Sequence, residues 1–134
     1  MDILAAVFVE GINQRQVPGP ATRIDLTGIM FSLVAPTPPP VSLSPHLVVL
    51  VRCPPDESGS ATLEVEFFDP AGAQVARSVQ PVNVEPGKFG RLLVKGDLTY
   101  GDYGTIEAHC RLVGAAGAKT SEVVVPLTLL PPAP

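Results

Sequence analysis

The sequence predicts an all-β protein, an antiparallel β-sandwich of seven or eight strands. Its 134 residues include 16 prolines and 12 glycines, which is too many for a helical protein and typical of turns between short strands. Apolar side chains recur at every second position in most segments, and no segment keeps the helical spacing. Turn signals separate these segments at intervals of about ten residues, as in a sandwich or barrel.

Length and composition predict a single domain. A chain of this size can bury about two-thirds of the surface that its unfolded form exposes. A hydrophobic fraction of 46% and a charged fraction of 16% suit a folded core. We assign residues 1–130 to the sandwich and residues 131–134, Pro-Pro-Ala-Pro, to a proline-rich tail outside it.

The alternation is clearest in two segments. In residues 62–67, leucine, valine and phenylalanine alternate with threonine and glutamate. In residues 103–113 the same period places Cys110 toward the core and His109 on the opposite, exposed face. Residues 46–53 are apolar at both parities, which indicates a central strand whose second face is covered either by a loop of this chain or by another subunit.

Two further strands carry irregularities. Residues 22–34 change parity at Gly28, so we expect a bulge or bend there. Pro126 cannot donate to a ladder, so its strand is expected to be an edge strand or to contain a bulge. The remaining strands are expected at residues 3–10, 74–79, 91–95 and 121–130.

The predicted turns agree with the predicted strands. Asp-Pro-Ala-Gly at residues 69–72 predicts an antiparallel hairpin with a positive φ near Gly72. Residues 114–117 predict a second hairpin turn, and Glu-Pro-Gly-Lys at residues 85–88 has the signature of a type II turn. The proline-rich residues 35–45 are expected to form a surface loop, which is one candidate cover for the strand that follows.

Charge and cysteine content indicate the environment. A net charge of −4 and a pI near 5.0 argue against nucleic acid and against anionic membrane surfaces as partners. The apolar N-terminal run has no basic flank and is broken at Glu10, so we expect a strand rather than a targeting segment, and a cytoplasmic location. Cys53 and Cys110 are then expected to be reduced, buried thiols.

The residues that could carry chemistry do not form a recognisable constellation. His109 and Cys110 are sequence neighbours, and neighbours on a strand point to opposite faces, so they cannot form a nucleophile–base pair. The loop carboxylates lack the spacing of a calcium site, and the glycine-rich turns do not match a phosphate loop. We therefore expect no catalytic, cofactor-binding or metal-binding residues, and no enzyme activity.

Surplus apolar residues on nominally outer faces indicate a candidate interface. We assign Val48, Leu50 and Phe68 to it, and Leu93 and Val124 show the same surplus. The leading hypothesis is a non-enzymatic protein-interaction or structural module that binds a protein partner or associates with itself as a homodimer. The alternative is a small-ligand-binding accessory domain that acts with a partner protein.

Three stretches carry a resemblance to a known family. Val-Arg-Cys-Pro-Pro-Asp-Glu at residues 51–57, the "strand, Asp-x-x-Gly, strand" hairpin at residues 63–72, and Gly-Asp-Tyr-Gly at residues 101–104 resemble a family of small uncharacterised bacterial proteins, immunoglobulin-like β-sandwiches of unknown function. The resemblance covers about half of the chain. It implies an immunoglobulin-like fold and a cytoplasmic origin, and it implies no activity.

Overall fold

The computed structural model of the chain describes residues 1–19, 21–114 and 121–133. Within these ranges the chain forms eleven strands and no helix. The strands are β1 (Asp2–Gln16), β2 (Thr22–Met30), β3 (Ser32–Val34), β4 (Val41–Leu43), β5 (His46–Arg52), β6 (Ser60–Phe68), β7 (Gln74–Asn83), β8 (Phe89–Lys95), β9 (Leu98–Tyr100), β10 (Gly104–Val113) and β11 (Ser121–Leu130).

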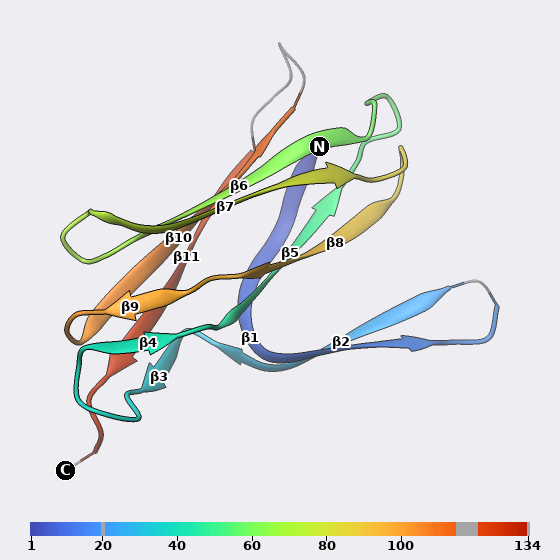
Figure 1. The fold of residues 1–134 in the computed structure, drawn as a ribbon. Helices are drawn as coiled ribbons and strands as arrows, with labels where there is room; N and C mark the ends of the chain where they lie inside the picture. The colour runs from blue at the N-terminus through green and yellow to red at the C-terminus, as the bar shows by residue number, and fades with distance from the viewer. Residues whose placement is uncertain (20, 115–120, 134) are drawn as a thin grey trace.

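Two main sheets pack face to face, and a short third sheet lies at one end of the sandwich (Figure 1). Sheet A has the strand order β2-β1-β5-β8, sheet B the order β3-β11-β10-β6-β7, and sheet C the order β4-β9. All of these pairings are antiparallel except that of β3 with β11. The predicted all-β antiparallel sandwich is therefore confirmed.

The core lies between sheets A and B and is built by alternating residues of their inner strands. Leu47, Val49 and Val51 of β5 belong to the same buried cluster as alternate residues of β6, β10 and β11. On β10, Cys110 is fully buried and His109 lies on the opposite face, as the alternation predicts. β5 lies between β1 and β8, so the prediction of an internal strand is also correct.

β1 and β2 continue past the sandwich as a two-stranded arm. β1 is 15 residues long; its residues 2–9 pair with β5, and its residues 8–16 pair with β2. Figure 1 shows β1 bending between these two parts, so that the paired ends of β1 and β2 project from one side of the sandwich. Sheet A is strongly curled as a result.

The segment predicted as one bent strand, residues 22–34, divides between the two main sheets. Gly28 has a φ of +64°, so the expected bend is present there. The chain then leaves sheet A after Met30, passes through Phe31, and joins sheet B as β3. Alternation reports which side chains are buried but not which sheet they belong to, so the crossing at Phe31 was not predicted.

The strand count differs from the predicted seven or eight for a simple reason. Of the eleven strands, β3, β4 and β9 are three residues long, and removing them leaves eight (11 − 3 = 8). A three-residue strand is too short to show a period of two.

Residues 131–133 follow β11 and are exposed. No helix in the described ranges is long and apolar enough to span a membrane.

Two predicted turns are present, and each has glycine at a positive φ. Gly72 has a φ of +87°, and its N–H donates to the Asp69 carbonyl at 2.9 Å, closing the β6–β7 hairpin. Gly87 has a φ of +83°, and the Lys88 N–H donates to the Glu85 carbonyl at 3.0 Å. The turn predicted at residues 114–117 falls largely in residues 115–120, outside the described part of the chain.

Within the described ranges, Pro126 of β11 pairs with a neighbouring strand on one side only. It pairs with Glu107 of β10 on one side, whereas β3 reaches only residues 128–130 of β11 on the other. Among the described residues, no strand pairs with Pro126 on its second side, which agrees with the predicted edge environment.

Candidate functional site

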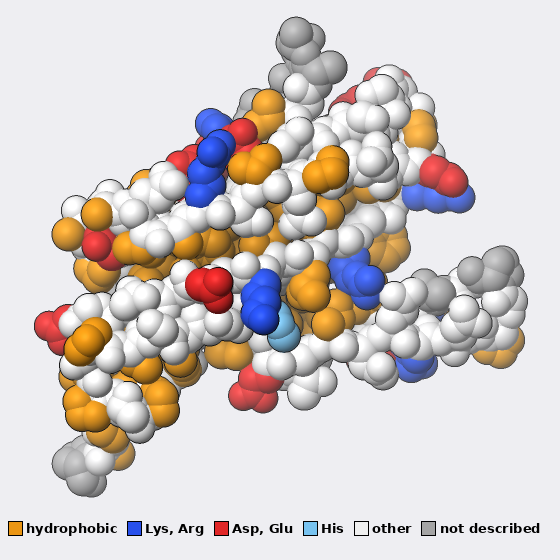
Figure 2. Space-filling model, in the orientation of Figure 1, with side chains coloured by type: hydrophobic (Ala, Val, Ile, Leu, Met, Phe, Trp, Pro, Cys, Tyr) orange, Lys and Arg blue, Asp and Glu red, His pale blue; other side chains and the backbone are white. Residues whose placement is uncertain are grey.

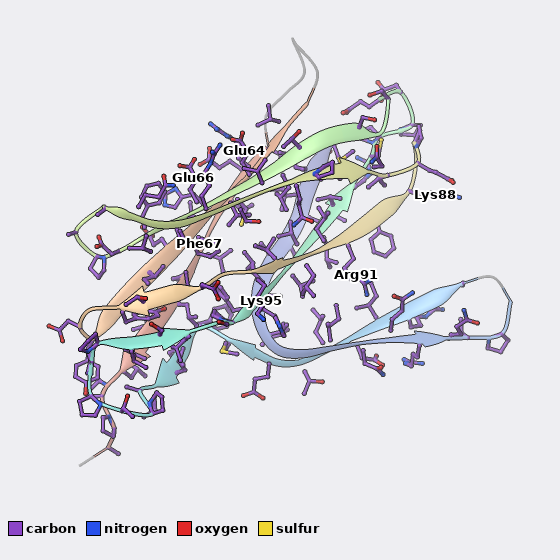
Figure 3. The ribbon with its side chains drawn as sticks, viewed as in Figure 1. Glu64, Glu66, Phe67, Lys88, Arg91 and Lys95 are labelled. Carbon is purple, nitrogen blue, oxygen red and sulfur yellow. The ribbon has the colours of Figure 1, made fainter. Side chains whose placement is uncertain are left out.

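The outer face of sheet B carries charged side chains, as is usual for a sheet face exposed to water. Glu64 accepts a hydrogen bond from Arg111 at 2.6 Å and lies 3.7 Å from Arg77. The Arg111 guanidinium lowers the pKa of Glu64, chiefly through this hydrogen bond. Glu64 and Glu66 extend away from the core on this side (Figure 3). Cross-strand ion pairs therefore satisfy much of the charge on this face.

The outer face of sheet A has the opposite character. Val9 and Val48 are at most 1% exposed, yet neither belongs to the core cluster between the sheets. Val48 pairs with Val7 on one side and with Leu93 on the other, so an apolar row crosses β1, β5 and β8. This row lies on the outer side of the curled sheet A.

Exposed apolar side chains on β1, β2 and β8 extend this surface. The most exposed are Leu4 at 55%, Ile29 at 51%, Phe89 at 59% and Leu93 at 45%. Leu50 is half-buried beside them. We call Leu4, Val48, Leu50, Phe89 and Leu93 the apolar face of sheet A.

A β-bulge places Leu4 on this face. The register between β1 and β5 shifts between Ile3 and Ala5, so Leu4 is an extra residue opposite β5. It then lines a groove of about 520 Å³ with Arg52, Lys88 and Phe89. The sequence alternation of β1 contains no signal for this shift.

Cationic side chains border the apolar face along β8. Arg91 and Lys95 are exposed and pair across the sheet with Leu50 and His46. Figure 3 shows both extending from β8 toward the side on which the arm lies. In the space-filling view, hydrophobic, Lys or Arg, and His side chains gather between β8 and the arm (Figure 2).

The three residues predicted as an interface do not form one patch. Val48 is fully buried and so forms the floor of the apolar face, not a contact surface of its own. Leu50 lies beside it, half-buried. Phe68 lies on the outer face of sheet B, where its ring packs edge-on against His109 at a centroid distance of 4.7 Å.

Phe68 lies outside the core, as its assignment to the candidate interface requires, but it is not the most exposed phenylalanine. Its contact with His109 leaves it half-buried, whereas Phe31 and Phe89 are 62% and 59% exposed. Phe89 follows the turn at residues 85–88 and begins β8, so its outward direction depends on where that strand starts. The sequence did not indicate Leu4 and Phe89 of the apolar face, or the exposed Ile29 on β2.

A second groove, of about 550 Å³, lies beside Phe68 and includes Asp69, Thr105, Glu107 and His109. Most of its polar groups are already engaged. Asp69 Oδ1 accepts hydrogen bonds from the N–H groups of Ala71 and Ala73, and the Thr105 hydroxyl is 2.7 Å from that of Thr128. Glu107 lies 3.8 Å from His109. Few polar groups are left to converge on a ligand here.

The cysteines are buried free thiols on different parts of the core. Burial raises the pKa of Cys110 to about 12, so its thiol is protonated at neutral pH and is a poor nucleophile. Among the residues that the structure describes, no three His, Cys, Asp or Glu side chains are grouped closely enough to hold a metal ion.

No protein-family model matches the chain, and no curated protein matches its sequence.

Proposed function

We propose that the chain is a non-enzymatic protein-interaction module that docks a protein onto the apolar face of sheet A. The observation that carries this proposal is the contrast between the two outer faces. Both faces expose apolar side chains, but on sheet B those of Val79 and Val124 lie among cross-strand ion pairs. On sheet A, Leu4, Phe89 and Leu93 surround a fully buried Val48.

Exposing the apolar face of sheet A to water is unfavourable. An antiparallel sheet with one solvated side alternates polar and apolar residues, as β6 and β10 of sheet B do. On sheet A the outer positions of β1 and β5 include Val7, Val9, Val48 and Leu50, which adds apolar surface without adding to the core. Contiguous apolar surface on a small domain is typical of a docking site.

The proline-rich loop does not supply the cover that the sequence left open. Residues 36–38 are exposed, and the loop leads into β4, which pairs with β9 in sheet C. The chain itself buries Val48, which is 0% exposed, so a protein partner or a second copy of the chain would cover the exposed Leu4, Phe89 and Leu93 around it. A cytoplasmic location is part of the same proposal, and the two buried free thiols support it.

The small-ligand alternative has weaker support. A binding pocket needs several polar groups aimed at one point. In the groove beside Phe68, Asp69 and Thr105 are used in internal hydrogen bonds, which leaves Glu107 and His109.

Site-specific photo-crosslinking tests the proposal. A photoreactive amino acid is placed at position 93 on the apolar face or, as a matched control, at position 124 on sheet B; Leu93 and Val124 are 45% and 47% exposed. In cells of the organism of origin, position 93 should give a discrete protein adduct and position 124 should not. Equal labelling at the two positions, or no adduct at position 93, would contradict the proposal.

A further inference from the structure

Arg91 and Lys95 place two positive charges at the border of the apolar face. They flank Leu93 on β8, and the three alternate along the strand as cation, leucine, cation. Leu92 and Val94 pack toward the core, so the odd-numbered positions of β8 share the outer face. Residues four apart on a strand are separated by roughly 13 Å.

These two cations have no partner within the described chain. The protein has nine Lys and Arg residues, of which Lys119 lies outside the described ranges, leaving eight. The other six take part in at least one polar or electrostatic interaction, whereas Arg91 and Lys95 form no ion pair or side-chain hydrogen bond with the described residues.

The absence of partners is specific to this edge. The chain carries more acidic than basic residues, with 13 Asp and Glu against nine Lys and Arg. Elsewhere in the described ranges the cations are engaged, as in the Arg111–Glu64 and Arg15–Asp25 pairs at 2.6 and 2.7 Å. Two unpaired cations beside an apolar surface form a pattern that an acidic, apolar partner would complement.

We propose that the apolar face of sheet A binds an acidic amphipathic segment of a partner protein. Its apolar side chains lie over Leu50 and Leu93, and its carboxylates pair with Arg91 and Lys95. This inference rests on the proposed function and adds the chemistry of the partner. The cations supply selectivity and a faster encounter, while the apolar contacts supply most of the affinity.

A second copy of this chain fits the charge pattern less well. The outer face of sheet B carries carboxylates that could complement β8, but its central one, Glu64, is already bonded to Arg111 and close to Arg77. Docking it against Arg91 and Lys95 would compete with these pairs. Self-association is therefore an outcome of the test that would overturn the proposal.

Three synthetic peptides of strand length test it. The first contains Glu-Thr-Val-Thr-Glu, so that on one face of the strand two Glu residues, four positions apart, flank a central Val. The second has Lys in place of Glu, and the third has Ser in place of Val. We expect the wild-type protein to bind the first peptide at least about tenfold more tightly than either of the others at low salt, with the Glu-over-Lys preference falling as salt rises to about 0.5 M.

Charge reversal supplies the matched control. Arg91→Glu combined with Lys95→Glu should invert the preference, so that the Lys peptide binds more tightly than the Glu peptide. Arg91→Gln with Lys95→Gln should abolish the preference without inverting it. All four substitutions are at exposed positions, and circular dichroism and the unfolding midpoint check that each variant is folded.

Other results would overturn the inference in distinguishable ways. Equal binding of the Glu and Lys peptides would remove the charge selectivity but leave apolar docking intact. Binding to phosphatidylserine vesicles, but not to phosphatidylcholine vesicles, that the charge reversal abolishes would replace the peptide with a lipid surface. A wild-type dimer in light scattering that the charge reversal dissociates would make a second copy the occupant. The crosslinking at position 93 tests the proposed function independently of these peptide experiments.

Discussion

The hydroxyl of Tyr100 donates a hydrogen bond to the backbone carbonyl of Leu127 across a distance of 2.8 Å in the buried interior. Tyr100 ends β9 in sheet C, and Leu127 lies on β11 in sheet B. The bond therefore ties the short end sheet to one of the two main sheets. Burial raises the pKa of Tyr100, which keeps the phenol in its neutral, donating form.

We expect Tyr100→Phe to lower the free energy of unfolding by about 0.5–1.5 kcal/mol, because it removes one buried hydrogen bond and keeps the ring. Urea unfolding followed by circular dichroism measures the change. Tyr103→Phe is the matched control, since the hydroxyl of Tyr103 makes no hydrogen bond to the described residues. Equal effects of the two substitutions would contradict the role given to the Tyr100–Leu127 bond.

The second prediction concerns alkaline stability. The Cys110 thiol has an ordinary pKa of 9.0 and a pKa of about 12 in the folded protein, raised by burial. Above pH 9 the unfolded chain loses this proton while the folded protein keeps it, so stability falls as pH rises. The loss is expected between about pH 9 and 12, at up to about 1.4 kcal/mol per pH unit.

Cys110→Ala should flatten this dependence, although it also lowers stability at neutral pH by leaving a small cavity. Cys53→Ala, which keeps Cys110, serves as the comparison. Tyr100, whose pKa is also raised by burial, should retain part of the alkaline loss in both variants. An unchanged pH profile in Cys110→Ala would show that the thiol does not contribute.

The third prediction concerns the β6–β7 hairpin. Gly72→Val should destabilise the protein by about 1–2 kcal/mol, because a β-branched residue is poorly tolerated at a φ of +87°. A Cβ atom at Gly72 would meet nothing within 4 Å, so the cost is conformational and not steric. Gly101→Val is the control: its surroundings are equally open, and its φ is not positive. Thermal unfolding of the two variants should separate them.

The fourth prediction separates the floor of the apolar face from its surface. Val48→Glu places a carboxylate at a position that is 0% exposed and should prevent folding or cost several kcal/mol. Leu93→Glu adds the same charge at a position that is 45% exposed and should change stability by about 0.5 kcal/mol or less. Chemical denaturation measures both, and a stable Val48→Glu protein would contradict the burial of this row.

The sequence predicted the elements whose burial alternates regularly. β6 and β10 have one wet and one dry face along their whole length, so a period of two identified their core residues, Cys110 included. Gly72 and Gly87 were predicted because Pro-Ala-Gly and Pro-Gly turns require a positive φ at a fixed position.

The rest depended on interactions distant in sequence. The bulge at Leu4 arises from the pairing of β1 with β5, and the exposure of Phe89 depends on which residue begins β8. Parity placed Phe68 outward, but its burial comes from His109 on a neighbouring strand. Val48 and Leu50 were correctly given an outer direction, whereas the curl that buries Val48 is a property of the whole sheet.

The parallel pairing of β3 with β11 has a consequence for folding during synthesis. Residues 32–34 pair with residues 128–130, which follow about 96 positions later in the chain (128 − 32 = 96). On the ribosome, β1, β2 and β5 can associate while the partner of β3 has not yet been made. Sheet B acquires β3 only after β11 emerges, so the segment from Phe31 to Val34, with three of its four residues exposed even in the finished fold, waits longest without a partner. We therefore expect the nascent chain to be open to aggregation or chaperone binding at this short strand until β11 emerges.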